Sequence, residues 1–204
     1  MDHAAAKDVL RQVFGSDSDD DDTKVAYPGP SGLKVVKGWL CPYRQENLLA
    51  AIAVEEWFAG SANQAMRFGG FPAWAEDLAE GIRSHFDSEQ LAERQPLFDQ
   101  LIANKYRPGE GLKPHVDLMR FQDGVAIVSL QAAATLSFTK GDRRVNVLLL
   151  PGDLLLLEGE ARYEWMHGIT AEASQQWQDR RVARGHRISV TLRKLREDVF
   201  NQTT

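Results

Sequence analysis

The apolar residues of this chain change their spacing along the sequence, and the change divides it into two parts. Between residues 42 and 57 they recur three or four positions apart, as they do again from 72 to 86, so we predict two amphipathic helices. After a polar link the pattern becomes that of strands. We predict strands over residues 33–39, 101–106, 126–130, 135–138, 145–150, 154–157 and 187–195.

Turn-forming residues separate these strands at 108–109, 140–142 and 151–153, where proline, glycine and aspartate are grouped. Several short strands broken by such turns are typical of a sandwich or jelly roll. The predicted fold class is therefore mainly β with flanking helices, in which the N-terminal helices buttress one side of a jelly-roll core. The stretch 60–72 between the two helices is predicted to be a loop.

The first 24 residues form a segment of different composition. Residues 2–14 have the pattern of a short helix, and residues 16–23 are an aspartate-rich run that we expect to be a disordered tether. Residues 1–24 hold seven of the 29 acids and three of the 24 bases, which leaves 22 acids against 21 bases in the rest. We predict one domain over 25–204, whose near-neutral charge is not typical of a tight duplex binder.

The remaining composition limits where the protein works. The single cysteine, Cys41, excludes a disulfide within the chain, and no apolar run approaches the roughly 20 residues of a membrane helix. The N-terminus lacks the order of a secretory signal. We expect an intracellular monomer of the cytoplasm or nucleus with no membrane segment.

Two histidines and one aspartate form a candidate metal site. His115 and Asp117 are two positions apart, so on an extended segment both side chains leave the same face, while His167 comes from another strand that the apolar run before it would supply. Two imidazoles and one carboxylate are the facial set of non-haem Fe(II) oxygenases. His186 is the rival ligand, but it precedes Arg187 and faces away from the arginine side of its strand.

Near the end of the chain, polar and apolar residues alternate. Arg187 and Arg193 lie on one face of a predicted strand with small hydroxyl residues between them, and the apolar residues point the other way. Two long cationic side chains that lean inward over small neighbours would suit a short dicarboxylate, with each end held by a charge-assisted pair of hydrogen bonds.

Taken in order, these motifs resemble the AlkB family of Fe(II)- and 2-oxoglutarate-dependent dioxygenases. They are Asn-x-Tyr-x-Pro-Gly, His-x-Asp, Pro-Gly-Asp, Gly-Glu-x-Arg-Tyr-x-Trp-x-His-Gly-Ile and two arginines six residues apart, over about ninety residues. The resemblance implies a double-stranded β-helix, which is a jelly roll, with Fe(II), 2-oxoglutarate and O2 as cofactors. It implies that iron is held by His115, Asp117 and His167, and 2-oxoglutarate by Asn104, Tyr106, Arg187 and Arg193.

The resemblance also implies an enzyme that oxidatively demethylates N-alkylated bases in DNA or RNA. Such an enzyme reaches its target base in a single strand or by flipping the base out of a duplex. In the family the segment before the β-core forms a lid over the base, so Arg67 and Phe68 are candidate substrate-binding residues. Glu158, Glu160 and Arg162, which precede the His167 strand, are further candidates for the pocket wall, and a surface salt bridge is the alternative role. A protein-directed hydroxylase or demethylase on the same core is the alternative, and the near-neutral body favours it.

Overall fold

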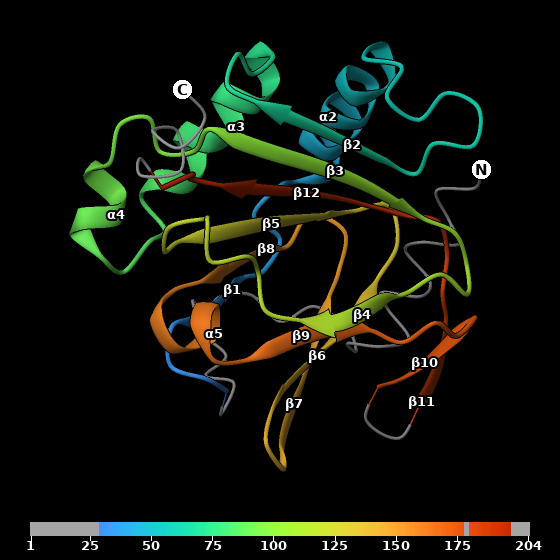
Figure 1. Cartoon of the computed structure of the whole chain (residues 1–204). Helices are drawn as coiled ribbons and strands as arrows, with labels where there is room; N and C mark the ends of the chain where they lie inside the picture. Colours follow the sequence, from blue (N-terminus) through green and yellow to red (C-terminus); the bar gives the residue numbers. More distant parts are fainter. Residues whose placement is uncertain (1–28, 178–179, 197–204) are drawn as a thin grey trace, which may run out of the picture.

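Two antiparallel sheets packed face to face form the body of the protein (Figure 1), as seen in a computed structural model that describes residues 29–177 and 180–196. The larger sheet has the strand order β1 (Leu33–Val36), β8 (Leu154–Leu157), β5 (Val125–Leu130), β12 (Arg187–Arg193), β3 (Gln100–Tyr106) and β2 (Gln64–Phe68). The smaller sheet has the order β4 (Leu112–His115), β9 (Met166–Ile169), β6 (Ala134–Lys140) and β7 (Arg143–Leu149).

The helices lie outside the larger sheet or at its ends. Figure 1 shows α2 (Pro42–Val54) and α3 (Ala73–Arg83) above the larger sheet, on the side away from the smaller one. Short helices α4 (Glu89–Glu93) and α5 (Gly159–Tyr163) lie at one end of the sheets, and β10 (Ser174–Trp177) pairs with β11 (Arg180–Ala183) in a separate ribbon. No helix in the described ranges is long and apolar enough to cross a membrane.

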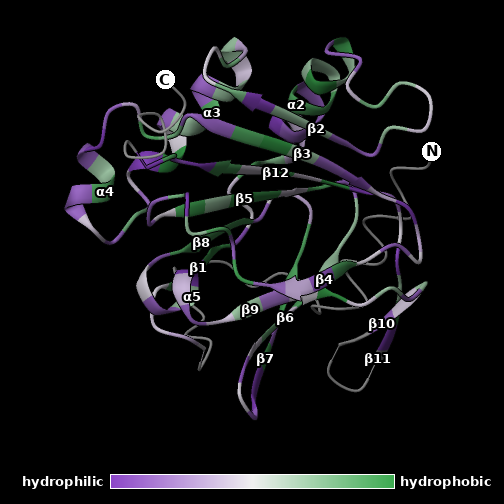
Figure 2. Cartoon of the chain, in the orientation of Figure 1, coloured by the Kyte–Doolittle hydropathy of each residue, from purple (hydrophilic) through white to green (hydrophobic). Residues whose placement is uncertain are grey.

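The larger sheet separates two hydrophobic cores. One lies between the sheet and the helices and contains Ile52, Ile82 and Val190, and the other lies between the sheets and contains Phe138 and Trp165. Strands β5 and β8 face both cores and are buried along their whole length, which is why they are continuous apolar runs. Figure 2 shows this hydrophobic colouring along β5 and β8, whereas the tip of β7 is hydrophilic.

The jelly-roll prediction is confirmed, as is the helical support on one side. The alternation in β12 is confirmed too, because Ile188, Val190 and Leu192 belong to the core under the helices, while Ser189 and Thr191 face the space between the sheets. Such alternation follows from strand geometry, so the sequence alone was sufficient to assign the two faces. The predicted helix and tether over 1–24 lie outside the described residues.

Three predictions about the strands were wrong. Residues 60–72 are not all loop, because Gln64–Phe68 pairs with β3 as an edge strand. His167 does not continue the apolar run 154–157, since that run is β8 in the larger sheet and His167 lies on β9 in the smaller one. The last predicted strand ends at Arg193, and Leu195 makes only an isolated bridge to Phe121. Short exposed strands such as β2 are formed by hydrogen bonds to a neighbouring strand, which local patterns do not reveal.

Candidate functional site

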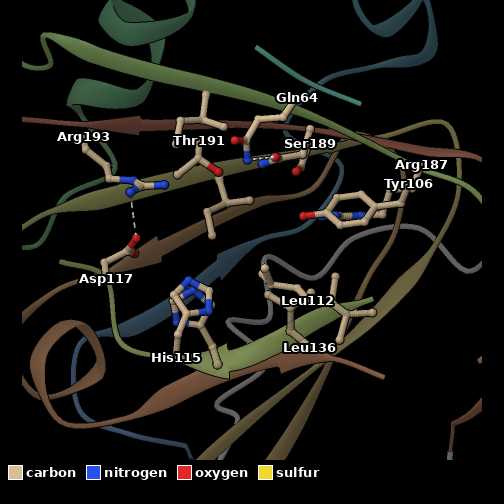
Figure 3. A pocket seen from close by; sticks show the side chains of 15 residues that line it. Gln64, Tyr106, Leu112, His115, Asp117, Leu136, Arg187, Ser189, Thr191 and Arg193 are labelled. Carbon is tan, nitrogen blue, oxygen red and sulfur yellow. Dashed lines mark hydrogen bonds and ion pairs between the residues drawn. The ribbon is translucent and has the colours of Figure 1, made fainter. Parts of the chain in front are cut away.

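A cavity of about 130 Å³ opens between the two sheets (Figure 3). Its polar wall comes from β3, β4, β9, β12 and the edge strand β2, and apolar residues such as Ile127 and Leu136 complete it. The structure brings all seven predicted iron and 2-oxoglutarate residues to this one cavity: Asn104, Tyr106, His115, Asp117, His167, Arg187 and Arg193.

The two histidines face each other across the β4–β9 pair. His115 is the register partner of His167, and their ring centroids are 4.5 Å apart. Two glycines permit this close approach. A Cβ at Gly111 would lie 2.4 Å from the Ile169 carbonyl oxygen, and one at Gly168 would lie 2.8 Å from the Leu112 carbonyl oxygen. Any larger residue at either position would push β4 away from β9 and separate the imidazoles.

Both imidazoles have a nitrogen free to bind a cation. The Nδ1 of His115 lies 2.9 Å from the Lys113 carbonyl oxygen, which can only accept, so in the neutral tautomer that makes this hydrogen bond Nδ1 donates and Nε2 has a lone pair for a metal. Burial lowers the pKa of His167 to about 4, with smaller effects of neighbouring charges, among which Asp117 raises it. Near neutral pH, His167 is therefore an unprotonated ligand.

The lowered pKa of His167 predicts that the metal-free protein loses stability in mild acid. His167 is protonated near pH 6.5 in the unfolded chain but only near pH 4 in the folded protein. The free energy of unfolding therefore keeps its full value above pH 6.5 and decreases as the pH falls from 6.5 to 4. The loss should reach about 3 kcal/mol. Denaturant unfolding of chelator-treated wild type and His167→Asn between pH 7 and 4 tests this. An equally steep pH dependence in the variant would contradict it.

Asp117 lies beyond the end of β4, in the segment that follows His115. Its Oδ1 is 3.0 Å from Nη1 of Arg193, so the carboxylate is directed at the arginine (Figure 3). Within residues 29–177 and 180–196 no three ligating side chains are grouped closely enough to hold a metal as they stand. The donor set still fits Fe(II), because two imidazoles and one carboxylate line the same cavity, and such a set leaves other coordination positions open.

Arg162 holds the segment that carries Asp117. Although it belongs to α5 and not to the cavity wall, its side chain is only 1% exposed. Its Nη1 donates to the Asp117 carbonyl at 3.0 Å, and its Nη2 donates to the carbonyls of Leu118 at 2.9 Å and Phe121 at 3.1 Å. Arg162 was proposed as a pocket residue from the sequence. That prediction was wrong, because the side chain lies behind the segment and fixes its backbone.

We expect Arg162→Met to destabilise the protein by about 3 kcal/mol, because three backbone carbonyl groups, two of them in buried hydrogen bonds, lose a charged donor. The guanidinium of Arg162 lies over the Tyr163 ring at 4.8 Å. Arg143 is a suitable control, since its guanidinium also lies over an aromatic ring, that of Trp165 at 4.9 Å, but it makes no such backbone contacts among the described residues. Urea unfolding of Arg162→Met and Arg143→Met should separate the two. Equal losses in both variants would mean that ring stacking, and not the backbone contacts, accounts for the effect.

Arg187 and Arg193 have different surroundings. Arg187 is 3% exposed, donates from Nε to the Ser129 hydroxyl at 3.1 Å and lies over the Tyr106 ring at 5.5 Å. Burial lowers its pKa to about 10, so it remains a cation at neutral pH. Arg193 lies over the Phe121 ring at 4.8 Å, and its buried Nε has no hydrogen-bond partner among the described residues. Both arginines can therefore still bind an anion.

The edge strand β2 contributes a pocket residue that sequence reasoning missed. Gln64 lines the cavity and donates from Nε2 to Oδ1 of Asn104 at 2.7 Å. The two residues are register partners across β2 and β3. Since residues 60–72 were predicted to be a loop, no strand alternation was assigned that could have placed Gln64 on the cavity face.

The two candidate substrate residues point in different directions. Arg67 is on the helix side of β2, where it pairs with Glu55 at 3.2 Å and lies over the Trp57 ring. Phe68 is on the same face as Gln64 and is 52% exposed, but it does not line the cavity.

The other candidates from the sequence lie away from the cavity. Glu158 accepts hydrogen bonds from the backbone of Asp87 and Ser88, and Glu160 pairs with Lys140 at 2.9 Å. Neither residue lines the pocket, so the pocket-wall prediction was wrong, and the alternative of a salt bridge is confirmed for Glu160. His186 is exposed and lies outside the cavity lining, which leaves His115 and His167 as the imidazoles of this site.

Comparison with known proteins agrees with this geometry. The profile of the 2OG-Fe(II) oxygenase superfamily matches residues 32–193. A protein of Acanthamoeba polyphaga mimivirus, named "Uncharacterized protein L905", is 24% identical over 81% of this chain and 85% of its own length. An Arabidopsis thaliana protein named "Alkylated DNA repair protein ALKBH8 homolog" is 27% identical over 81% of this chain. A Xenopus tropicalis protein named "tRNA (carboxymethyluridine(34)-5-O)-methyltransferase alkbh8" is 43% identical over 35% of it. The chain spans only 58% and 12% of the last two relatives.

Solved structures share the fold. The structure of OsALKBH1 superimposes with a TM-score of 0.57 at 16% identity, and covers 80% of this chain and 98% of its own. A Pseudomonas putida prolyl-4-hydroxylase gives a TM-score of 0.56 at 16% identity, and covers 81% of this chain and 93% of its own. The chain therefore belongs to the 2OG-Fe(II) oxygenase superfamily.

Proposed function

We propose that this protein is an Fe(II)- and 2-oxoglutarate-dependent dioxygenase that oxidatively demethylates N-alkylated bases in DNA or RNA. The observation that carries the proposal is the single cavity in which two imidazoles, a carboxylate and two arginines meet. We assign His115, Asp117 and His167 to the iron. When bound, Fe(II) with 2-oxoglutarate and O2 supplies the oxidation that converts an N-methyl group to a hydroxymethyl group, which leaves as formaldehyde, while 2-oxoglutarate becomes succinate and CO2.

The protein's own residues position the co-substrate. Arg187 and Arg193 are six positions apart on the cavity face of β12, separated by the small Ser189 and Thr191, so they present cations toward the two ends of a dicarboxylate. We assign the carboxylate nearer the metal to Arg193, because this arginine already contacts Asp117. The distal carboxylate goes to Arg187, beside Tyr106. Charge-assisted hydrogen bonds to guanidinium groups are the strong ones.

The assignment of a nucleic-acid substrate is supported by the names of two relatives, one a DNA repair protein and the other a tRNA methyltransferase. Enzymes that act on a base take it out of the stack and often hold it against an aromatic side chain. Exposed Phe68 on the cavity face of the edge strand is suited to that contact. We further propose that the protein acts on such substrates in the cytoplasm or nucleus, and that it acts as a monomer.

A protein-directed hydroxylase or demethylase is the second candidate. It is supported by the fold shared with prolyl hydroxylases and by the nearly equal numbers of acids and bases beyond residue 24. Arg67 also favours this alternative, because it is held by Glu55 and Trp57 on the helix side and does not add positive charge to the cavity face.

One experiment separates the two candidates. The purified protein is incubated with Fe(II), 2-oxoglutarate and a matched panel of methylated oligonucleotides and methylated peptides, and products are identified by mass spectrometry. We expect loss of one methylene unit from an oligonucleotide, together with succinate. A mass change confined to the peptides would replace the nucleic-acid proposal by the protein-directed one. The absence of succinate with every substrate would contradict both.

A further inference from the structure

The side chain of Gln64 makes a hydrogen bond in the cavity that sets the orientation of the Asn104 side-chain amide. Its Nε2 donates to Oδ1 of Asn104 at 2.7 Å, as the dashed line beside Gln64 in Figure 3 shows. A carboxamide carries its acceptor and its donor on opposite corners. Because Oδ1 is turned toward β2, the Nδ2 group of Asn104 is turned away from it.

Asn104 lies on β3 beside the part of β12 that separates the two arginines. It is the register partner of Ser189, which lies between Arg187 and Arg193 on the cavity face of β12. An amide at this position adjoins the central part of a dicarboxylate held by the two arginines. Oxygen atoms of such a molecule accept hydrogen bonds, so a donor here contributes to binding and an acceptor opposes it.

We propose that Gln64 is a positioning residue that keeps the Asn104 amide in its donor orientation toward 2-oxoglutarate. The inference rests on the proposed placement of 2-oxoglutarate between the arginines. Gln64 acts through Asn104. For this role the residue at position 64 must supply a hydrogen-bond donor at the edge of the cavity. A residue that can only accept at position 64 should reverse the amide, because Nδ2 would then turn toward β2 and Oδ1 toward the co-substrate.

The test is Gln64→Glu, a substitution of nearly equal size whose carboxylate can only accept near neutral pH. We expect 2-oxoglutarate to bind on the order of 30-fold more weakly, since a favourable contact to a charged ligand becomes unfavourable. Gln64→Met removes the hydrogen bond without reversing the Asn104 amide, and it should weaken 2-oxoglutarate binding about threefold. Calorimetric titration of the protein loaded with Mn(II) in place of iron measures binding without turnover.

Met66→Glu is the matched control. Met66 is two positions along the same strand and the same face, is 52% exposed, and faces Ile102 instead of Asn104. It adds the same charge near the cavity without contact to the amide, so near-wild-type affinity in Met66→Glu together with a large loss in Gln64→Glu supports the inference. In turnover assays, Gln64→Glu should raise the KM for 2-oxoglutarate and leave kcat at saturation nearly unchanged.

Two results would overturn the inference in distinguishable ways. If wild type binds 2-oxoglutarate and Gln64→Glu binds it equally well, or no worse than Met66→Glu, the amide orientation is not set by Gln64, while the proposed function stands. If wild type loaded with Mn(II) binds no 2-oxoglutarate, the proposed function fails and the inference fails with it.

Discussion

Replacing His167 with alanine is expected to abolish succinate production, with a loss of more than about 100-fold. Even residues that only orient a metal ligand typically cost 10- to 100-fold when removed, so loss of a ligand itself should cost more. His167 is 4% exposed and lies at the cavity wall opposite His115, where the change removes a nitrogen donor. Succinate yield and iron content per protein, measured after reconstitution with Fe(II), give the result.

The control for this prediction is His186→Ala. His186 was the rival ligand in the sequence, and the structure leaves it exposed and outside the cavity. It should keep wild-type iron content and turnover, and circular dichroism should show that both variants remain folded. Full iron occupancy and succinate production in His167→Ala, with a loss in His186→Ala, would transfer the ligand role to His186.

The arginine pair should control the affinity for 2-oxoglutarate. Arg187→Ala and Arg193→Ala each remove a charged donor to a carboxylate, which should cost about 1.5–3 kcal/mol, or roughly 10- to 150-fold in Kd. Arg187→Lys keeps the charge but loses the planar fork and the stacking on Tyr106, so it should lie between wild type and alanine. Calorimetric titration of 2-oxoglutarate at saturating metal gives this order.

Arg67→Ala is the matched control for the arginine pair. It removes the same charge from β2, where Arg67 contacts Glu55 on the helix side of the sheet. Its Kd for 2-oxoglutarate should equal that of wild type. If Arg187→Ala and Arg193→Ala also bind 2-oxoglutarate normally, but bind the methylated substrate more weakly, the two arginines belong to the substrate surface instead.

The difference between local pattern and long-range contact explains how much of this protein the sequence alone revealed. The two helices predicted within 42–57 and 72–86, the turns and the two faces of β12 follow from patterns within one segment, and those predictions are confirmed. The identity of the candidate ligands also came from the sequence, since the ordered motifs limited the choice to few residues. Each such inference needs only neighbouring residues and the spacing between them.

Tertiary structure decided what depends on a partner distant in the sequence. Gln64–Phe68 becomes a strand only because β3 offers a free edge, and this pairing sets Gln64 beside Asn104. Arg162 resembles a pocket residue in the sequence, yet it is buried behind Asp117 because α5 packs against that segment. Burial and strand register are set when the sheets assemble. Side-chain roles that depend on them therefore cannot be predicted from the spacing of polar and apolar residues within one segment. The sequence therefore determined which chemical groups are available, and the packing of the sheets determined what each group contacts.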